Sequence, residues 1–449
     1  MLYKERQGQN EREQHEKGPR VNRRLSDDGP TIADMTLRSM VSGSGLLCLW
    51  IISGCAGDDS ASGAGETDTT GPGEADTGTD TEADTEADTG TDTDAETETG
   101  TGTNTEEPVS PYDGEPLPDA EVDEWSWVDF PDAFCRDGST AGIGVRYGLE
   151  NKVMIFFQGG GACFNSTSCS FNPAAYGSGD FDGWKDGGGR QGVLDTDNPD
   201  NPLAEWSVIY VPYCTGDVHF GDKPDAEIAG VGTQQFVGYR NVDRFLDRVV
   251  PTFFDAEHVL VAGVSAGGFG AALNYDRIAE SFPKSEVTLL DDSGPPMADD
   301  YLAPCLQSQW RDAWNLDMTL PQDCDDCFAD NGGGLVGLAP FLGAKHGDSV
   351  LALISSDEDT VIRSFFGFGT NECSVLLPSM TASLFKEGLY DLRDNALKAG
   401  GMWGSFIIPG EKHTWIGDNG VYNAEVSGML MIDWITDILV RDPQHISPE

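Results

Sequence analysis

The stretch Val259-Leu260-Val261-Ala262-Gly263-Val264-Ser265-Ala266-Gly267-Gly268 decides which fold this chain is expected to adopt. The segment from Glu257 to Ala262 is mostly apolar and partly β-branched, and it ends at a glycine turn, which predicts a buried strand. Gly263 to Gly267 match the pattern G-x-S-x-G, in which small residues on both sides of the serine permit a sharp turn. That turn would hold the Oγ atom of Ser265 clear of the sheet, at the start of a helix expected from Ala266 to about Ser281. A glycine-rich turn with an ordinary serine is the alternative, but the preceding strand and the following helix favour a reactive Ser265.

Apolar runs on both sides of this motif predict further strands, which alternate with segments of helical spacing. The strands are expected at residues 142–149, 152–158, 206–212, 286–290, 349–355 and 403–409. Helices are expected at residues 234–250, with Pro251 as the stop, within 376–399 and at 426–440. Residues 164–202 predict a loop with little regular structure, and residues 304–348 predict a cap or insertion beside the site. The alternation indicates an α/β fold with a mostly parallel central sheet and helices on both faces.

A second glycine-rich turn follows the strand expected at residues 152–158. It consists of Gly159-Gly160-Gly161-Ala162-Cys163. A strand that runs into such a turn is typical of the loop that presents a backbone N–H to an oxyanion in lipases and esterases. A flexible hairpin is the alternative, and the downstream G-x-S-x-G motif weakens it.

Histidine is the expected general base, because its pKa lies near the working pH. Where the serine lies in a G-x-S-x-G turn after a strand, the chain order is serine, then acid, then histidine. By this order and by elimination, His413 after the last expected strand is the candidate base. The other histidines lie in the leader, before the serine, before the acid candidates or in the tail: His15, His219, His258, His346 and His445. Asp359 is the preferred acid, Asp357 is the alternative, and Asp291 or Asp292 could substitute.

The charge of the chain is strongly unbalanced. It has 27 Lys and Arg against 77 Asp and Glu, a formal net charge of −50. Much of this charge lies in residues 57–108, which repeat Thr-Asp, Thr-Glu and Gly. Such a tract cannot bury enough apolar surface to offset chain entropy, and its like charges repel, so it predicts a disordered, extended spacer. The acidity argues against nucleic-acid binding. Residues 109–449 are long enough for one large α/β domain.

An export signal is expected before the acidic tract. Arg38 precedes an apolar run from Gly45 to Ile52 and then small residues, which is the pattern of a signal peptide. Ile52-Ser53-Gly54-Cys55 resembles the lipobox of bacterial lipoproteins, in which the cysteine is lipidated. We therefore expect a membrane-anchored protein of the bacterial cell envelope, with a secreted protein as the alternative. The expected parts are a non-native or disordered leader (1–34), a signal peptide (35–54), Cys55 with its linker (55–108) and a catalytic domain (109–449).

Eight cysteines remain after Cys48 and Cys55, and an even number in an exported chain predicts disulfides. They are Cys135, Cys163, Cys169, Cys214, Cys305, Cys324, Cys327 and Cys373. The expected pairs include Cys163 with Cys169, and Cys135 with Cys214. The Cys324-x-x-Cys327 spacing could be half of a zinc site, but no second pair accompanies it, so a disulfide is preferred and no metal is expected.

Together these segments resemble the pectin acetylesterase and Notum family of α/β-hydrolases. The matching pieces occur in the family's order over about residues 125–440: 157–163, 213–214 with 216–217, 263–268, 292–294, the turn 357–361 and His413. The resemblance implies an α/β-hydrolase-like fold, with Ser265 as the nucleophile, His413 as the base and an Asp of the 357–359 turn as its orienter. It also implies an oxyanion hole made by the N–H groups of Gly161, Ala162 and Ala266.

The resemblance further implies a serine carboxylesterase that needs no cofactor. Plant members of the family remove acetyl groups from pectin, and the animal member removes a fatty acyl group from a signalling protein. Many members have Trp where this chain has Ala162, so the wall of the acyl pocket differs. The expected substrate is an acetyl or short-chain acyl ester, with an acetylated polysaccharide as a candidate, and the expected state is a monomer. A catalytically inactive, surface-anchored binding module on the same fold is the alternative, and a protease is less favoured.

Overall fold

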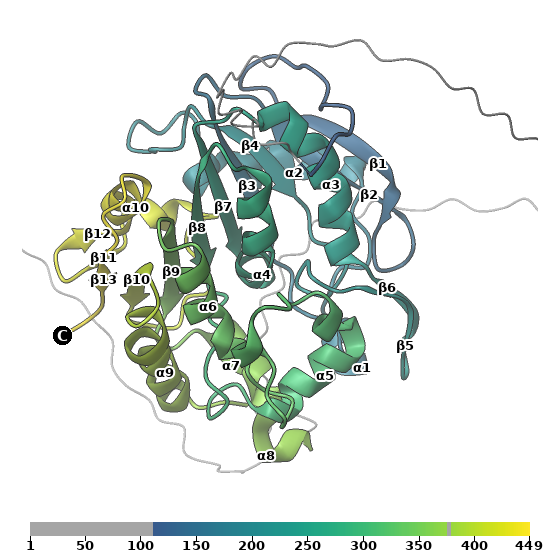
Figure 1. The fold of residues 1–449 in the computed structure, drawn as a ribbon, viewed down its shortest axis with the longest axis vertical. Coiled ribbons are helices and arrows are strands. Elements are labelled where there is room, and N and C mark those ends of the chain that lie inside the picture. The colour runs from purple at the N-terminus through teal and green to yellow at the C-terminus, as the bar shows by residue number, and fades with distance from the viewer. Residues whose placement is uncertain (1–110, 375–378) are drawn as a thin grey trace, which may run out of the picture. The chain divides into compact units, whose positions relative to one another are not determined.

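The computed structural model describes residues 111–374 and 379–449 (Figure 1). The leader, the signal peptide, Cys55 and the acidic spacer lie outside the described residues, so their predictions stay predictions. No helix in the described ranges is long and apolar enough to cross a membrane.

A nine-stranded sheet forms the centre of the domain, with the strand order β1-β2-β4-β3-β7-β8-β9-β10-β13. Its strands are β1 (Ser126–Phe134), β2 (Thr140–Arg146), β3 (Lys152–Phe157), β4 (Ser207–Val211), β7 (His258–Val264), β8 (Glu286–Asp292), β9 (Val350–Ser356), β10 (Met402–Ile408) and β13 (His445–Ile446). The β1–β2 and β2–β4 pairs are antiparallel, and all pairs from β4 to β13 are parallel. The predicted mostly parallel sheet is therefore confirmed.

Helices cover both faces of this sheet, because its central strands are apolar on both sides. Along β3, Val153, Ile155 and Phe157 belong to one buried cluster, whereas Met154 and Phe156 belong to the other. The first cluster packs under α3 (Gly238–Phe253), α4 (Ala266–Ser281), α5 (Pro304–Trp314), α6 (Leu338–Lys345), α7 (Thr360–Phe366) and α9 (Ala382–Asp391). The second packs against α2 (Ser178–Lys185) and α10 (Met431–Leu439). Side chains that alternate between two buried faces are the expected pattern of a parallel α/β sheet.

The remaining elements are short. They are the helices α1 (Ser166–Cys169) and α8 (Thr370–Cys373), the π-helix η7 (Leu392–Leu397), and the hairpins β5 (Lys223–Ile228) with β6 (Gly232–Phe236) and β11 (Glu425–Val426) with β12 (Met429–Leu430). The 3-10 helices are η1 (Gly188–Arg190), η2 (Gly192–Leu194), η3 (Leu316–Met318), η4 (Asp325–Cys327), η5 (Leu335–Gly337), η6 (Gly367–Gly369) and η8 (Asn419–Tyr422).

Several predicted elements were wrong in extent. Residues 164–202 contain α1 and α2 rather than only loop, and the strand β1 was not predicted. The helix expected at 234–250 begins later, because residues up to Phe236 pair in the β5–β6 hairpin. It also runs past Pro251, which lies inside its last turn. A proline has a helical φ and removes only one hydrogen bond there, so it did not stop the helix at once.

Four disulfides cross-link the described part of the domain. The expected pairs Cys135–Cys214 and Cys163–Cys169 are present. The other two, Cys305–Cys373 and Cys324–Cys327, lie in or next to the predicted cap at residues 304–348. The cap prediction is thus confirmed, and its cysteines are all paired.

Candidate active site

Ser265 lies between β7 and α4 in a strained backbone conformation. Its φ of 60° and ψ of −122° fall outside the ordinary regions for a residue with a side chain. Two glycines make this turn possible. A Cβ atom at Gly263 would lie 2.0 Å from the carbonyl oxygen of Gly267, and one at Gly267 would lie 2.0 Å from that of Phe157. The sequence requirement for small residues around the serine therefore has a direct steric cause.

His413 follows β10 and meets Asp359, which follows β9. Its Nδ1 atom lies 2.7 Å from the Oδ2 atom of Asp359, whose side chain is fully buried. The Oδ1 atom of the same carboxylate accepts hydrogen bonds from the N–H groups of Val361 and Ile362, at 2.9 and 3.0 Å. Asp359 is thus both the N-cap of α7 and the partner of His413. The parallel pairing of β9 with β10 brings the two loops to the same edge of the sheet.

Ser265 and His413 are connected through Asp292 rather than directly. The carbonyl oxygen of Asp292 accepts from the N–H of Ser265 at 2.7 Å. Its Oδ2 atom accepts from the N–H groups of Trp415 and Ile416 at 2.6 and 2.8 Å, two and three residues after His413. Burial raises the pKa of Asp292 to about 6, although these hydrogen bonds and His413 act to lower it. Among the described residues, no hydrogen bond joins Ser265 Oγ to His413. Catalytic hydrogen bonds are often long in enzymes without substrate.

The other acid candidates have different partners. Asp357 is fully buried, its Oδ1 atom accepts from the N–H of Gly410 at 2.9 Å, and its Oδ2 atom lies 2.6 Å from Lys386 Nζ. Asp291 Oδ1 accepts from the N–H of Gly294 at 2.8 Å, and burial raises its pKa well above the usual range. The geometry therefore brings Asp359, the preferred candidate, to His413.

The N–H groups expected to form the oxyanion hole lie around Ser265. Gly161, Ala162 and Ala266 all line the same pocket as Ser265. Their N–H groups donate to no acceptor within residues 111–374 and 379–449. Gly161 has a φ of 80°, which a residue with a side chain would adopt only under strain. Three unpaired donors next to the serine are the arrangement that an oxyanion requires.

An apolar pocket extends from Ser265 under the cap. Its empty volume is about 760 Å³, including the part that is open to solvent. Apart from Ser265, every lining residue is a glycine or carries an apolar or aromatic side chain. They include Phe269, Leu273, Leu302, Trp310, Trp314, Leu316, Leu335, Leu338, Ile362 and Phe365. Such a lining can hold an aliphatic group but offers a charged substrate little compensation for lost water.

Within the described residues, the other four histidines and the CxxC motif have structural partners, whereas His15 lies outside them. His219 is 3% exposed with Nε2 2.8 Å from the Gln158 carbonyl oxygen, and burial lowers its pKa to about 4. His258 bonds Thr288, His346 bonds Asp276 and His445 bonds Ser405. Cys324 and Cys327 form a disulfide with each other. In the described parts of the chain, no group of three His, Cys, Asp or Glu residues is placed to hold a metal ion.

Sequence reasoning missed two kinds of site residue. It did not find Asp292 as the connection between the serine turn and the His413 loop. It also did not single out Tyr213 and Asn172, which donate to carbonyl oxygens of the glycine turn at 159–162. Only the Asp292-Ser293-Gly294 and Tyr213-Cys214 matches to the family pattern pointed to these places.

Comparisons with known proteins agree with this geometry. The family model described as pectinacetylesterase matches residues 127–329. Palmitoleoyl-protein carboxylesterase notum1' of Xenopus laevis is 30% identical over 171 residues, which are 36% of this chain and 34% of the relative. Palmitoleoyl-protein carboxylesterase NOTUM of Homo sapiens is 30% identical over 173 residues, again 36% and 34% of the two chains. The alignments thus cover about a third of the length of these relatives.

A solved structure shares the fold. It is that of the Wnt deacylase Notum from Drosophila, with a TM-score of 0.55 and 17% identity, covering 72% of this chain and 95% of the other. At that identity the likeness shows the fold alone. Over somewhat less than half of its length, this chain is therefore similar to the pectinacetylesterase and Notum family, and the solved structure adds the shared fold.

Proposed function

We propose that this protein is a serine carboxylesterase that hydrolyses acyl esters through Ser265, His413 and Asp359. The observation that carries the proposal is the position of Ser265. It lies in a strained turn, at the mouth of an apolar pocket that is also lined by three residues with unpaired N–H groups. A purely structural serine would not need that combination.

The reaction follows from these parts. His413 takes the proton of Ser265, and the Oγ atom forms a bond to the ester carbonyl carbon. The electron pair of the carbonyl moves to its oxygen, where the N–H groups of Gly161, Ala162 and Ala266 stabilise the charge. Removing one such donor costs about 3–4 kcal/mol in comparable sites. The bond between the carbonyl carbon and the alcohol oxygen then breaks, and His413 protonates the leaving alcohol. In the second half, His413 takes a proton from water as the water oxygen bonds to the acyl carbon, the bond to Ser265 Oγ breaks, and His413 returns the proton to Oγ.

The acyl group is proposed to lie in the apolar pocket. The sequence predicted an acetyl or short-chain group. The lining supports the longer part of that range, because it continues past Phe269 to Leu335 and Leu338 under the cap. Burying each additional CH2 group contributes about 0.8 kcal/mol. Nitrophenyl esters of rising acyl length should therefore show kcat/KM values that first rise and then fall where the pocket ends.

Ser265→Ala is the central test of the proposal. The variant should fold normally and lose ester hydrolysis by about 10³-fold or more. His413→Ala should lose nearly as much, and the double variant should lose no more than either alone, because the residues act as a unit. His346→Ala, which breaks a hydrogen bond to Asp276 outside the site, is the matched control and should keep its activity. Ester hydrolysis by Ser265→Ala at the wild-type rate would contradict the proposal. A wild type without esterase activity would favour the alternative of a catalytically inactive binding module.

We also propose that the protein is exported and anchored by a lipid on Cys55. The four disulfides support an oxidising compartment. Cell fractionation of the wild type and of Cys55→Ser tests the anchor, because several acyl chains give stable membrane attachment. The wild type should sediment with membranes, and the variant should be released into the soluble fraction. Equal solubility of the two proteins would exclude the anchor but leave the esterase proposal intact.

A further inference from the structure

Two side chains from outside the glycine turn hold its carbonyl oxygens. The Nδ2 atom of Asn172 donates to the carbonyl oxygen of Gly160 at 2.8 Å. The Oη atom of Tyr213 donates to that of Gly161 at 2.9 Å. Both donors come from other segments, since Asn172 follows α1 and Tyr213 follows β4.

These bonds fix the direction of the N–H groups as well. In a trans peptide, the C=O of one residue and the N–H of the next lie in one plane and point in opposite directions. Holding the Gly160 carbonyl therefore directs the N–H of Gly161, and holding the Gly161 carbonyl directs the N–H of Ala162. These are two of the three unpaired N–H groups beside Ser265.

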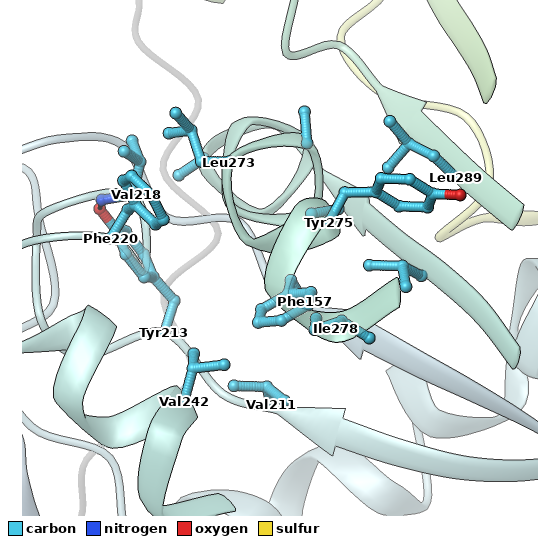
Figure 2. Close-up of a cluster of buried hydrophobic side chains, with 14 of the residues drawn as sticks. Phe157, Val211, Tyr213, Val218, Phe220, Val242, Leu273, Tyr275, Ile278 and Leu289 are labelled. Atoms are coloured by element: carbon cyan, nitrogen blue, oxygen red, sulfur yellow. Dashed lines mark hydrogen bonds between the residues drawn. The ribbon is translucent and has the colours of Figure 1, made fainter. Parts of the chain in front are cut away.

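The phenol of Tyr213 is held in a fixed position beside the glycine turn. It is 1% exposed, and Figure 2 shows it next to Val218, on the other side of Phe157 from Tyr275. Its Oη atom accepts from the N–H of Val218 at 2.9 Å, so its own proton is directed to Gly161. A Cβ atom at Gly160 would lie 2.5 Å from the Tyr213 ring, so ring and turn are in close contact.

We propose that Tyr213 and Asn172 are positioning residues that aim the N–H groups of Ala162 and Gly161 at the oxyanion. The inference rests on the proposed esterase activity and deepens it. Without these bonds each peptide is free to rotate, and the donors lose part of the preorganisation on which their effect depends. Neither residue lines the pocket beside Ser265, so substrate binding should be unaffected by their substitution.

Tyr213→Phe tests the proposal, with Tyr275→Phe as the matched control. Tyr275 is equally buried, and its hydroxyl also donates to a backbone carbonyl, that of Val287, at 2.8 Å. Both variants remove one buried hydroxyl, and Tyr213→Phe should lower Tm at least as much as Tyr275→Phe, because it also leaves the N–H of Val218 without its acceptor. Tyr213→Phe should lower kcat by about tenfold or more with little change in KM, whereas Tyr275→Phe should keep the wild-type kcat.

A trifluoromethyl ketone that carries the preferred acyl chain provides a second readout. Ser265 adds to its carbonyl carbon, the serine proton moves to His413, and the electron pair goes to the oxygen, which becomes an oxyanion. Its inhibition constant should rise in Tyr213→Phe by about the factor by which kcat falls. The inhibition constant of the free fatty acid should be the same for Tyr213→Phe and the wild type. A general loss of folding would instead weaken both inhibitors.

Asn172→Ala tests the same idea through another segment, should Tyr213→Phe fail to fold. Its control is Asn201→Ala, because Asn201 is also 7% exposed and its Nδ2 atom donates to the carbonyl oxygen of Val193 at 3.1 Å. A loss of kcat at constant KM for Asn172→Ala alone would support the proposal. If the wild type hydrolyses esters and the two site variants match their controls, the positioning role is wrong and the esterase proposal remains. If the wild type shows no hydrolysis, the esterase proposal fails first.

Discussion

Asp357 and Asp359 are two residues apart, yet their carboxylates stabilise different parts of the site. Asp359 bonds His413 and caps α7, whereas Asp357 bonds Gly410 and lies against Lys386. The first arrangement holds the imidazole itself. The second holds the backbone of the loop that carries it, because Gly410 begins that loop.

Substitution of each Asp by Asn should separate these two roles. Asp359→Asn would place an amide against Nδ1 and favour the wrong tautomer of His413, so kcat should fall by roughly 10³-fold or more. Asp357→Asn keeps an oxygen for Gly410 and should lose much less activity, with its main effect on Tm. Steady-state kinetics and thermal unfolding of both proteins provide the comparison. A larger loss of kcat in Asp357→Asn would show that the acid is assigned to the wrong residue.

At the scale of elements, helix α6 contributes Leu338 to the wall of the apolar pocket beside Ser265. A smaller cavity lies behind this wall and shares Ala272, Pro296 and Leu338 with the pocket. Leu342, one turn further along α6, lines only the rear cavity. Leu338 is therefore a side chain that separates the two spaces, and Leu342 is a similar buried leucine that does not.

Leu338→Ala should join the two cavities and shift the preferred ester to a longer acyl chain. Leu342→Ala is the matched control, since both variants remove the same atoms from buried positions and should each cost about 2–5 kcal/mol of stability. The kcat/KM profile over nitrophenyl esters of rising chain length is the measurement. The same shift in both variants would mean that general loosening, and not the wall, determines chain length.

For the whole molecule, buried acids and buried histidines act in opposite directions on stability between about pH 4 and pH 6. Burial lowers the pKa of His219, His258 and His445 to about 4, so they favour folding less as the pH falls. Burial raises the pKa of Asp217 to about 6. Between the ordinary pKa of an Asp and this raised value, the folded state keeps a proton that the unfolded state has lost. The contribution of Asp217 to the free energy of unfolding therefore falls as the pH rises from about 4 to about 6.

Asp217→Asn should therefore gain stability relative to the wild type as the pH rises from 4 to 7. The two pKa values of Asp217, 3.8 and about 6, correspond to a change of up to about 3 kcal/mol. Asp394→Asn is the control, because Arg393 holds the pKa of Asp394 below its usual range. Its contribution to stability is lost only at more acidic pH, so the difference between this variant and the wild type should stay nearly constant from about pH 4 to 7. Urea unfolding at both pH values measures the difference. A constant difference between wild type and Asp217→Asn would contradict the raised pKa.

The sequence by itself determined the features that depend on neighbours in the chain. The strand, the turn at Ser265 and the helix α4 follow from short-range periodicity and from the need for glycine at 263 and 267, and α4 begins and ends where it was expected. The parallel sheet, the cap and the order of serine, acid and histidine follow from the same kind of pattern. The strand β1 and the β5–β6 hairpin were missed, because their surroundings rather than their own apolar content stabilise them.

Only the tertiary structure decided between partners that are distant in the chain. Asp357 and Asp359 have the same chemistry and nearly the same position, and the pairing of β9 with β10 brings Asp359 to His413. The hydrogen bond from Tyr213 to Gly161 joins residues separated by 52 positions, and no local pattern encodes it. Hydrogen bonds of this kind depend on the direction of individual side chains after the sheet has formed, so a one-dimensional pattern cannot specify them.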